Sequence, residues 1–84
     1  MKIMNTPNVT IYTTPSCHFC HMAKEYFKAN NVAYTEHDVA SDVVQGKEMI
    51  DKSGQMGVPV IIIDSELIVG FNKPLISKLL ALPA

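Results

Sequence analysis

The 84-residue sequence contains no arginine, and its seven lysines are balanced by eight acidic residues, so the formal net charge is −1. Proteins that bind nucleic acid or an anionic membrane surface usually carry a basic patch that neutralises phosphate groups. This composition provides no excess of positive charge for such a patch. We therefore expect neither nucleic acid nor a membrane among the partners.

Long apolar runs are also missing from the chain. No segment approaches the roughly 20 apolar residues that span a bilayer, and the start, MKIMNTP, has no apolar run of secretory length. We therefore expect a cytoplasmic location. A reducing cytoplasm disfavours structural disulfides, so the only two cysteines, Cys17 and Cys20, are better explained by redox chemistry or by metal binding.

Linkers, internal repeats and low-complexity tracts are absent, and 84 residues provide material for one hydrophobic core. Hydrophobic residues make up 48% of the chain, which argues against intrinsic disorder. The sequence therefore predicts one domain over residues 1–84, with a short N-terminal tail at residues 1–7.

Changes in the spacing of apolar residues predict elements in the order β-α-β-α-β-β-α. Runs of β-branched and aromatic residues predict strands at residues 8–13, 32–38, 58–63 and 66–70. Helices are predicted from the cysteine pair to Asn30-Asn31, from a Ser41 or Asp42 cap to about Lys52, and onward from a start between Asn72 and Pro74. This order predicts an α/β fold, a four-stranded mixed sheet flanked by helices.

Each predicted helix should bury apolar side chains that recur at spacings of three and four. In the first helix the expected stripe consists of Phe19, Met22, Ala23, Tyr26 and Phe27. In the second, the expected apolar contacts are Val43, Val44, Met49 and Ile50. In the third, they are Leu75, Ile76, Leu79 and Leu80.

The stretch YTTPSCHFCH, residues 12–21, is compatible with a thiol redox pair, with haem attachment through Cys-x-x-Cys-His, and with a zinc site. Haem is disfavoured because the chain predicts a self-sufficient alternating fold and no export signal is expected. Zinc is disfavoured because His18 and His21 share the turn of the cysteines, whereas a structural zinc site usually draws a second ligand pair from another element. We therefore favour the redox pair and expect no metal site.

The position of the cysteines supports this choice. They lie where the first strand leads into the first helix, and a helix N-terminus presents unpaired N–H groups and a partial positive charge that stabilise a thiolate. Cys17, first in the turn, should be the exposed nucleophile. Cys20, one turn inward, should be the resolving thiol that attacks the mixed disulfide formed at Cys17.

Three motifs occur in an order that resembles the glutaredoxins from about Val9 to Leu82: CHFC opening a helix at 17–20, GVP before a buried strand at 57–59, and GF after a hairpin at 70–71. Within that family the chain is most similar to the short glutaredoxin-like redoxins, a group that includes the NrdH-redoxins, which supply electrons to ribonucleotide reductase. The resemblance implies a thioredoxin-like fold, thiol-disulfide exchange and a cis Val58–Pro59 bond. An iron-sulfur or metal-binding module is less favoured, because cluster-carrying members usually have a single active-site cysteine.

The resemblance also implies where a substrate binds. Backbone groups of Val58, ahead of Pro59, would pair with an extended substrate segment beside Cys17. Gly70 and Phe71 would border the same groove.

The two residues between the cysteines, His18 and Phe19, are expected to flank the substrate. His18 stands where family members usually have Pro or Gly, and when protonated it would place a positive charge beside the thiolate, although a solvated imidazole of small effect is the alternative. Phe19 stands where Tyr is common, and it would line the groove or join the core.

The expected electron donor depends on the stretch from Val69 to Lys73. Glutathione-using members hold the glutathione ammonium there with carboxylates, whereas this stretch has none and ends in a lysine. We therefore expect no bound cofactor and electrons from NADPH through thioredoxin reductase or a similar flavin reductase, with glutathione as the alternative. The expected partners are disulfide-containing proteins, ribonucleotide reductase among them, and the expected state is a monomer.

Overall fold

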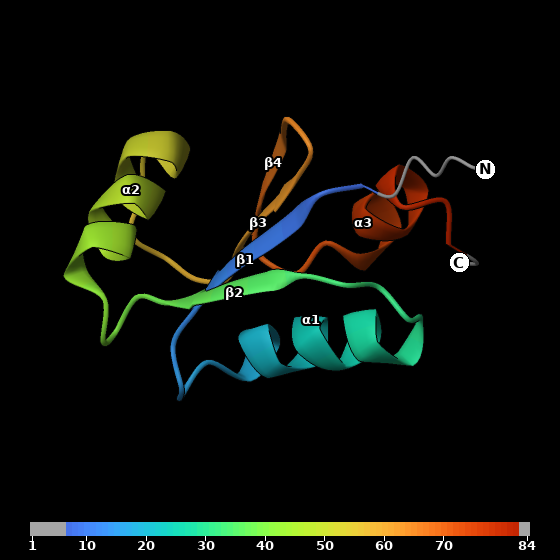
Figure 1. Ribbon diagram of the computed structural model, residues 1–84, viewed down its shortest axis with the longest axis horizontal. Helices are drawn as coiled ribbons and strands as arrows, with labels where there is room; N and C mark the ends of the chain where they lie inside the picture. Colours follow the sequence, from blue (N-terminus) through green and yellow to red (C-terminus); the bar gives the residue numbers. More distant parts are fainter. Residues whose placement is uncertain (1–6, 83–84) are drawn as a thin grey trace.

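The computed structural model describes residues 7–82, which form the predicted order of strands and helices (Figure 1). The elements are β1 Val9–Thr13, α1 His18–Ala29, β2 Thr35–Asp38, α2 Val43–Ser53, β3 Val60–Ile63, β4 Glu66–Val69 and α3 Lys73–Leu79. Of the predicted tail at 1–7, residues 1–6 lie outside the described part of the chain. No helix within residues 7–82 is long and apolar enough to cross a membrane.

The strands form one mixed sheet in the order β2-β1-β3-β4, in which β1 and β2 are parallel and the other neighbours are antiparallel. The pairing of Tyr12 with Val60, and of Val60 with Val69, fixes the register of the central strands. The end of β1, the start of β3 and the end of β4 therefore meet at one end of the sheet.

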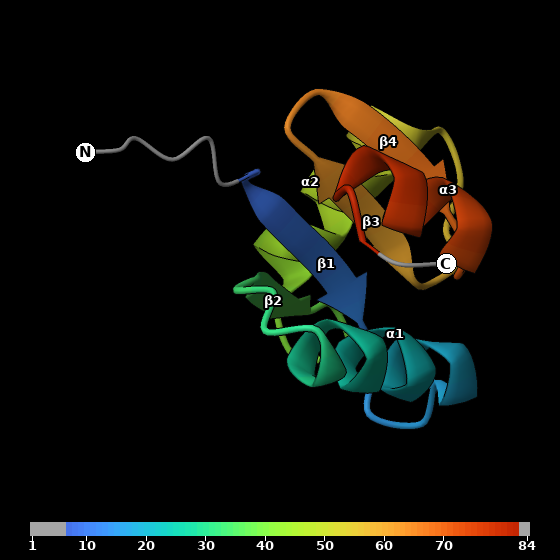
Figure 2. The ribbon, with the colours of Figure 1, turned by 90° about the vertical axis from the view of Figure 1, so that its right-hand side faces the viewer.

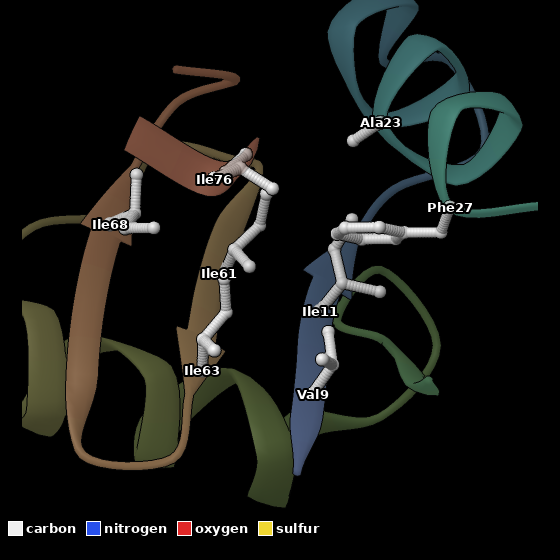
Figure 3. Close-up of a cluster of buried hydrophobic side chains, with 8 residues drawn as sticks. All are labelled: Val9, Ile11, Ala23, Phe27, Ile61, Ile63, Ile68 and Ile76. Carbon is white, nitrogen blue, oxygen red and sulfur yellow. The ribbon is translucent and has the colours of Figure 1, made fainter. Parts of the chain in front are cut away.

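Helices cover both faces of the sheet: α1 and α3 pack on one face and α2 on the other (Figure 2). On the α1 and α3 side, Phe27 and Ile76 point toward Ile11 and Ile61 of the central strands (Figure 3). On the α2 side a smaller cluster contains Tyr12, Met49 and Val60. The alternation of strand residues between the two faces follows the period of two that the β backbone imposes.

The helix ends follow from local chemistry. Asp42 caps α2 through a 3.1 Å hydrogen bond accepted from the Gln45 N–H, which decides between the two predicted caps. Gly54 ends α2 with a left-handed φ of 73°, a conformation that costs little without a Cβ. Asn72 caps α3, since its side chain accepts from the Leu75 N–H at 3.3 Å.

All four strands are shorter than predicted, by one residue in β1 and β4 and by more in β2 and β3. The strand predicted from residue 32 begins at Thr35, because the Val32 N–H donates to the Phe27 carbonyl at 2.8 Å and so belongs to the turn that ends α1. The strand predicted from residue 58 begins at Val60, because Pro59 has no N–H to donate to a neighbouring strand.

The predicted burial of α1 is wrong at two positions. Phe19 is 57% exposed and Met22 is 41% exposed, whereas α1 buries Cys20, Ala23 and Phe27. Ala23 and Phe27 are buried as predicted, and Cys20 completes a buried set that keeps the helical spacing of three and four residues. The side of α1 that carries Met22 is thus left open, and it borders the pocket described below.

The predicted burial of α2 is wrong at its N-terminus. Val43 and Val44 are 75% and 73% exposed, Ile50 is 38% exposed, and Met49 is the one fully buried residue of the helix. In α3, Ile76 is buried as predicted, but Leu75 is 38% exposed. Apolar residue type alone therefore overstates how much of each helix the sheet covers.

Candidate functional site

Cys17 is the N-cap residue of α1, with an extended backbone at φ −82° and ψ 113°. Its Sγ accepts a 3.1 Å hydrogen bond from the Cys20 N–H, and its own N–H donates to the Thr14 carbonyl at 3.2 Å. The sulfur is thus held in the first turn, where unpaired N–H groups and the helix dipole favour negative charge. Cys17 is partly exposed, and both cysteines are free thiols.

Cys20 has the opposite environment, because it is fully buried beneath the first turn of α1. Burial, followed by its hydrogen bond with Cys17, raises the pKa of the Cys20 thiol from 9.0 to about 12. A hydrogen bond with the Thr14 backbone and the charge of Lys24 act in the opposite direction. The pair therefore combines an accessible sulfur with a protected, protonated one.

The sheet register brings the other predicted site residues to the same end of the molecule. The Val58–Pro59 bond is cis, as the resemblance implies. Pro59 accepts a 2.8 Å hydrogen bond from the Gly70 N–H through its carbonyl, which links the start of β3 to the end of β4. Because Tyr12 pairs with Val60, the turn that follows β1 and carries Cys17 lies beside this loop.

A pocket of about 460 Å³ opens beside the cysteine turn, between α1 and the segment that leads into α3. The α1 wall carries His18, His21, Met22 and Glu25, residues spaced three and four apart on one helical face. Opposite them lie Phe71 and Lys73.

Aromatic packing shapes the floor of this pocket. Tyr26 packs edge-on against Phe71 with ring centroids 5.9 Å apart, and Lys73 Nζ lies 5.3 Å from the Tyr26 centroid. Of the predicted substrate-binding residues, His18 and Phe71 line the pocket. Phe19 does not line it, and its side chain is exposed instead of joining the core.

Sequence reasoning missed Glu25 as a member of this site. The stretch from Val69 to Lys73 contains no carboxylate, as expected, but Glu25 brings one to the pocket from α1. The signal was available in the helical spacing of residues 18, 21, 22 and 25, although only the tertiary packing of α1 against Phe71 shows which face is open. Among residues 7–82 no three His, Cys, Asp or Glu side chains are grouped so that they could hold a metal ion.

Comparisons with known proteins agree with this geometry. The family model for glutaredoxin matches residues 9–68. An uncharacterized glutaredoxin-like 8.6 kDa protein in the rubredoxin operon of Clostridium pasteurianum is 47% identical over 72 residues, 86% of this chain and 96% of that protein. Glutaredoxin 3 of Escherichia coli K12 is 38% identical over 63 residues, 75% of this chain and 76% of that protein.

Solved structures show the same fold. The crystal structure of the thioredoxin-like protein BC3987 is 34% identical, with a TM-score of 0.82 over 87% of this chain and 100% of that chain. A glutaredoxin from Archaeoglobus fulgidus shares the fold at 19% identity, with a TM-score of 0.78 over 89% of this chain and 87% of that chain.

Proposed function

Since this chain belongs to the glutaredoxin family and is a thiol-disulfide oxidoreductase, we propose that it reduces disulfides of other proteins as an electron donor. The observation that carries the proposal is the asymmetry of the cysteine pair. Cys17 is accessible at the N-terminus of α1, and Cys20 is buried directly behind it. Dithiol exchange needs such a division between an attacking thiol and a resolving thiol.

The reaction proceeds in two displacements. The Cys17 thiolate attacks one sulfur of the substrate disulfide, the substrate S–S bond breaks, and the leaving thiolate takes up a proton. The Cys20 thiol then loses its proton and attacks Cys17 Sγ, which breaks the mixed disulfide and releases the second substrate thiolate. Two electrons pass to the substrate, and the protein is left with a Cys17–Cys20 disulfide.

The substrate binds across the end of the sheet that carries Cys17. An extended segment pairs with backbone groups of Val58 beside Pro59, in the manner of a strand added to a sheet. Gly70, with a φ of 88°, lets the chain turn away directly after β4. A side chain next to the substrate disulfide enters the pocket between His18 and Phe71, and Phe19 contacts the substrate from the exposed side of the turn.

The electrons come from NADPH through thioredoxin reductase or a similar flavin reductase, as in the NrdH-redoxins. What supports this donor is the stretch from Val69 to Lys73, which offers no carboxylate and places an ammonium group at the pocket. A glutathione ammonium there would meet a like charge. Ribonucleotide reductase is the substrate we propose to test first, with the protein acting as a monomer and without a bound cofactor.

A glutathione-dependent activity is the second candidate, and Glu25 is the observation that favours it. Its carboxylate lines the same pocket as Lys73, so it could pair with a glutathione ammonium in place of the missing loop carboxylates. A charge-assisted hydrogen bond of this kind contributes about 1.5–3 kcal/mol, which is about ten- to a hundred-fold in affinity. Reduction of the protein by glutathione should therefore depend on Glu25, whereas reduction by thioredoxin reductase should not.

The test is insulin-disulfide reduction followed by two NADPH-coupled assays, one with thioredoxin reductase and one with glutathione and glutathione reductase. We expect turnover with thioredoxin reductase, little with glutathione, and no insulin reduction by Cys17→Ser. Efficient turnover with glutathione alone, reduced about ten-fold or more in Glu25→Gln but not in the matched surface variant Asp51→Asn, would establish the second candidate. Insulin reduction that survives Cys17→Ser would exclude both.

A further inference from the structure

Three polar side chains form a connected cluster between α1 and the sheet. Thr13 Oγ1 donates to Glu36 Oε2 at 2.7 Å, and Lys24 Nζ donates to the same oxygen at 2.9 Å. Thr13 is 1% exposed, and the side chains of Lys24 and Glu36 are 18% and 35% exposed. One carboxylate oxygen thus holds a partly buried ammonium group in a fixed position.

The strand register places this cluster on the face of the sheet that α1 covers. Ile11 and Thr13 share a face because strand side chains alternate, and Ile11 belongs to the core beneath α1. Glu36 pairs directly with Ile11 across the parallel strands, so it lies on this face too. Thr13, at the end of β1, therefore places a hydroxyl on the core-facing side of the strand, and this hydroxyl binds the Glu36 carboxylate.

Lys24 lies one helical turn after Cys20. Residues four apart are neighbours on a helix surface, and helical side chains lean toward the N-terminus, so the Lys24 stem extends back toward Cys20. Thr13 immediately precedes Thr14, whose backbone forms a hydrogen bond with Cys20. The cluster consequently lies near the buried thiol, which the Lys24 charge influences.

Few charges act on Cys20 in this environment. The titratable groups that influence it are Cys17, which opposes its ionisation, and Lys24, which favours it. From β2, Glu36 acts through its ion pair with Lys24, and β1 contributes Thr13, which carries no charge. When Cys17 is in a mixed disulfide it carries no negative charge, and Lys24 is then the charge that remains beside Cys20.

We propose that Lys24, held by Glu36 and Thr13, is a positioning residue that stabilises the thiolate of Cys20 during the second displacement. The inference deepens the proposed function and rests on it. In this step the Cys20 proton passes to solvent, the Cys20 electron pair forms the S–S bond to Cys17, and the bond from Cys17 to the substrate sulfur breaks. That sulfur leaves as a thiolate and takes up a proton from solvent.

The cluster offsets part of the free-energy cost of ionising a buried thiol. Burial disfavours the charged form of Cys20, yet the thiolate is the form that attacks. A free lysine on the surface of α1 would extend into water, where its charge is screened, whereas the 2.9 Å bond to Glu36 keeps the ammonium beside the helix. Glu36 is therefore needed to place the charge, and Lys24 supplies it.

The test uses 5,5′-dithiobis(2-nitrobenzoate) as a small disulfide substrate for the reduced protein. Attack by Cys17 releases one coloured thiolate in a bimolecular phase, and attack by Cys20 releases the second in a unimolecular phase. We expect Lys24→Met to slow the second phase about ten-fold at neutral pH and to shift its pH profile upward by about one unit, with the first phase unchanged. Lys24→Arg should restore the second phase, and Glu36→Gln should slow it.

Lys28→Met is the matched control, because it removes the same charge from the last turn of the same helix. A second phase in Lys24→Met with the rate and pH profile of the parent, or an equal effect of Lys28→Met, would overturn the inference. Failure of the proposed function gives a different result, since the parent protein itself would then release no second thiolate or would react without Cys17. An unchanged midpoint of urea denaturation in Lys24→Met would separate the kinetic effect from a loss of structure.

Discussion

At the residue scale, the roles proposed for the two cysteines follow from their positions one turn apart. Cys17 accepts a hydrogen bond at the helix N-terminus and faces solvent, whereas Cys20 is fully buried. The hydrogen bond that fixes Cys17 Sγ is donated by the Cys20 backbone N–H, so the first turn of α1 holds the two cysteines in a fixed relative position. The proposed order of attack is thus a consequence of helix geometry.

This order makes a direct prediction for single-cysteine variants. Cys20→Ser should accumulate a mixed disulfide between Cys17 and a substrate protein, because the resolving thiol is absent and the intermediate has no intramolecular exit. Mass spectrometry of the variant after incubation with an oxidised substrate should show the adduct at Cys17. Cys17→Ser should give little adduct, since its remaining thiol is buried and protonated. Equal trapping by both variants would contradict the assigned roles.

The sequence pointed to some residues of the candidate site, and it missed others for a physical reason. Cys17, Cys20 and Pro59 stand in short motifs whose chemistry is local, so their positions could be predicted. Glu25 and the pair of Lys24 with Glu36 depend on long-range packing, since Lys24 and Glu36 are twelve residues apart and meet only when α1 lies across β2. The spacing of residues along a helix shows which side chains share a face, but it does not show which other element that face contacts.

At the element scale, α1 and α2 are attached to the sheet by different sets of contacts. α1 buries Ala23 and Phe27 in the larger cluster, whereas α2 is attached mainly through Met49 and through the hydrogen bond from Tyr12 to Glu48, at 2.9 Å. Helix bounds were predictable because caps and stops are local, as Asp42 and Gly54 show. Burial was less predictable, because it depends on the rotation of each helix against the sheet.

The attachment of α2 predicts which apolar substitutions matter. Met49→Ala should lower the free energy of unfolding by about 2–5 kcal/mol, because it leaves a cavity in the smaller cluster. Val43→Ala and Val44→Ala should each change it by less than about 0.5 kcal/mol, because both side chains are largely exposed. Urea denaturation of the three variants provides the measurement. A cost at Val43 or Val44 similar to that at Met49 would show that the N-terminus of α2 is packed.

The glycine inside α2 and the glycine that ends it predict effects of opposite sign. Gly54 has a φ of 73° and open space around an added Cβ, so Gly54→Ala should cost about 1–2 kcal/mol through backbone conformation alone. Gly46 lies inside the helix, and an added Cβ would meet Val39 at an ordinary 3.6 Å, so Gly46→Ala should stabilise by about 0.5–1 kcal/mol.

Thermal or urea denaturation of the two glycine variants would measure both changes. Gly54→Asn serves as a control, because asparagine tolerates the left-handed conformation better than alanine. Stabilisation by Gly54→Ala would contradict the assigned helix end.

At the scale of the whole molecule, each face of the sheet contains a buried titratable group whose pKa is raised. On the α1 face, burial raises the pKa of Cys20 to about 12. On the α2 face, burial and the hydrogen bond to Glu48 raise the pKa of Tyr12 from 10.0 to about 12. Both groups are neutral in the folded state and lose a proton more readily in the unfolded chain, so the stability of the reduced protein is linked to alkaline pH.

The sign of this linkage gives the last prediction. Between about pH 9 and 12 the unfolded state binds fewer protons than the folded state, so the free energy of unfolding should fall as pH rises. The loss should begin near pH 9 from Cys20 and steepen above pH 10 as Tyr12 contributes, with each group adding at most about 1.4 kcal/mol per pH unit. Urea denaturation of the reduced protein from pH 7.5 to 11 should show full stability at the lower end and a progressive loss above pH 9. Cys20→Ala should remove the early part of the loss, and Tyr12→Phe the part above pH 10. A flat profile across this range, or slopes that neither variant reduces, would contradict the assignment of these two buried groups as the source of alkaline sensitivity.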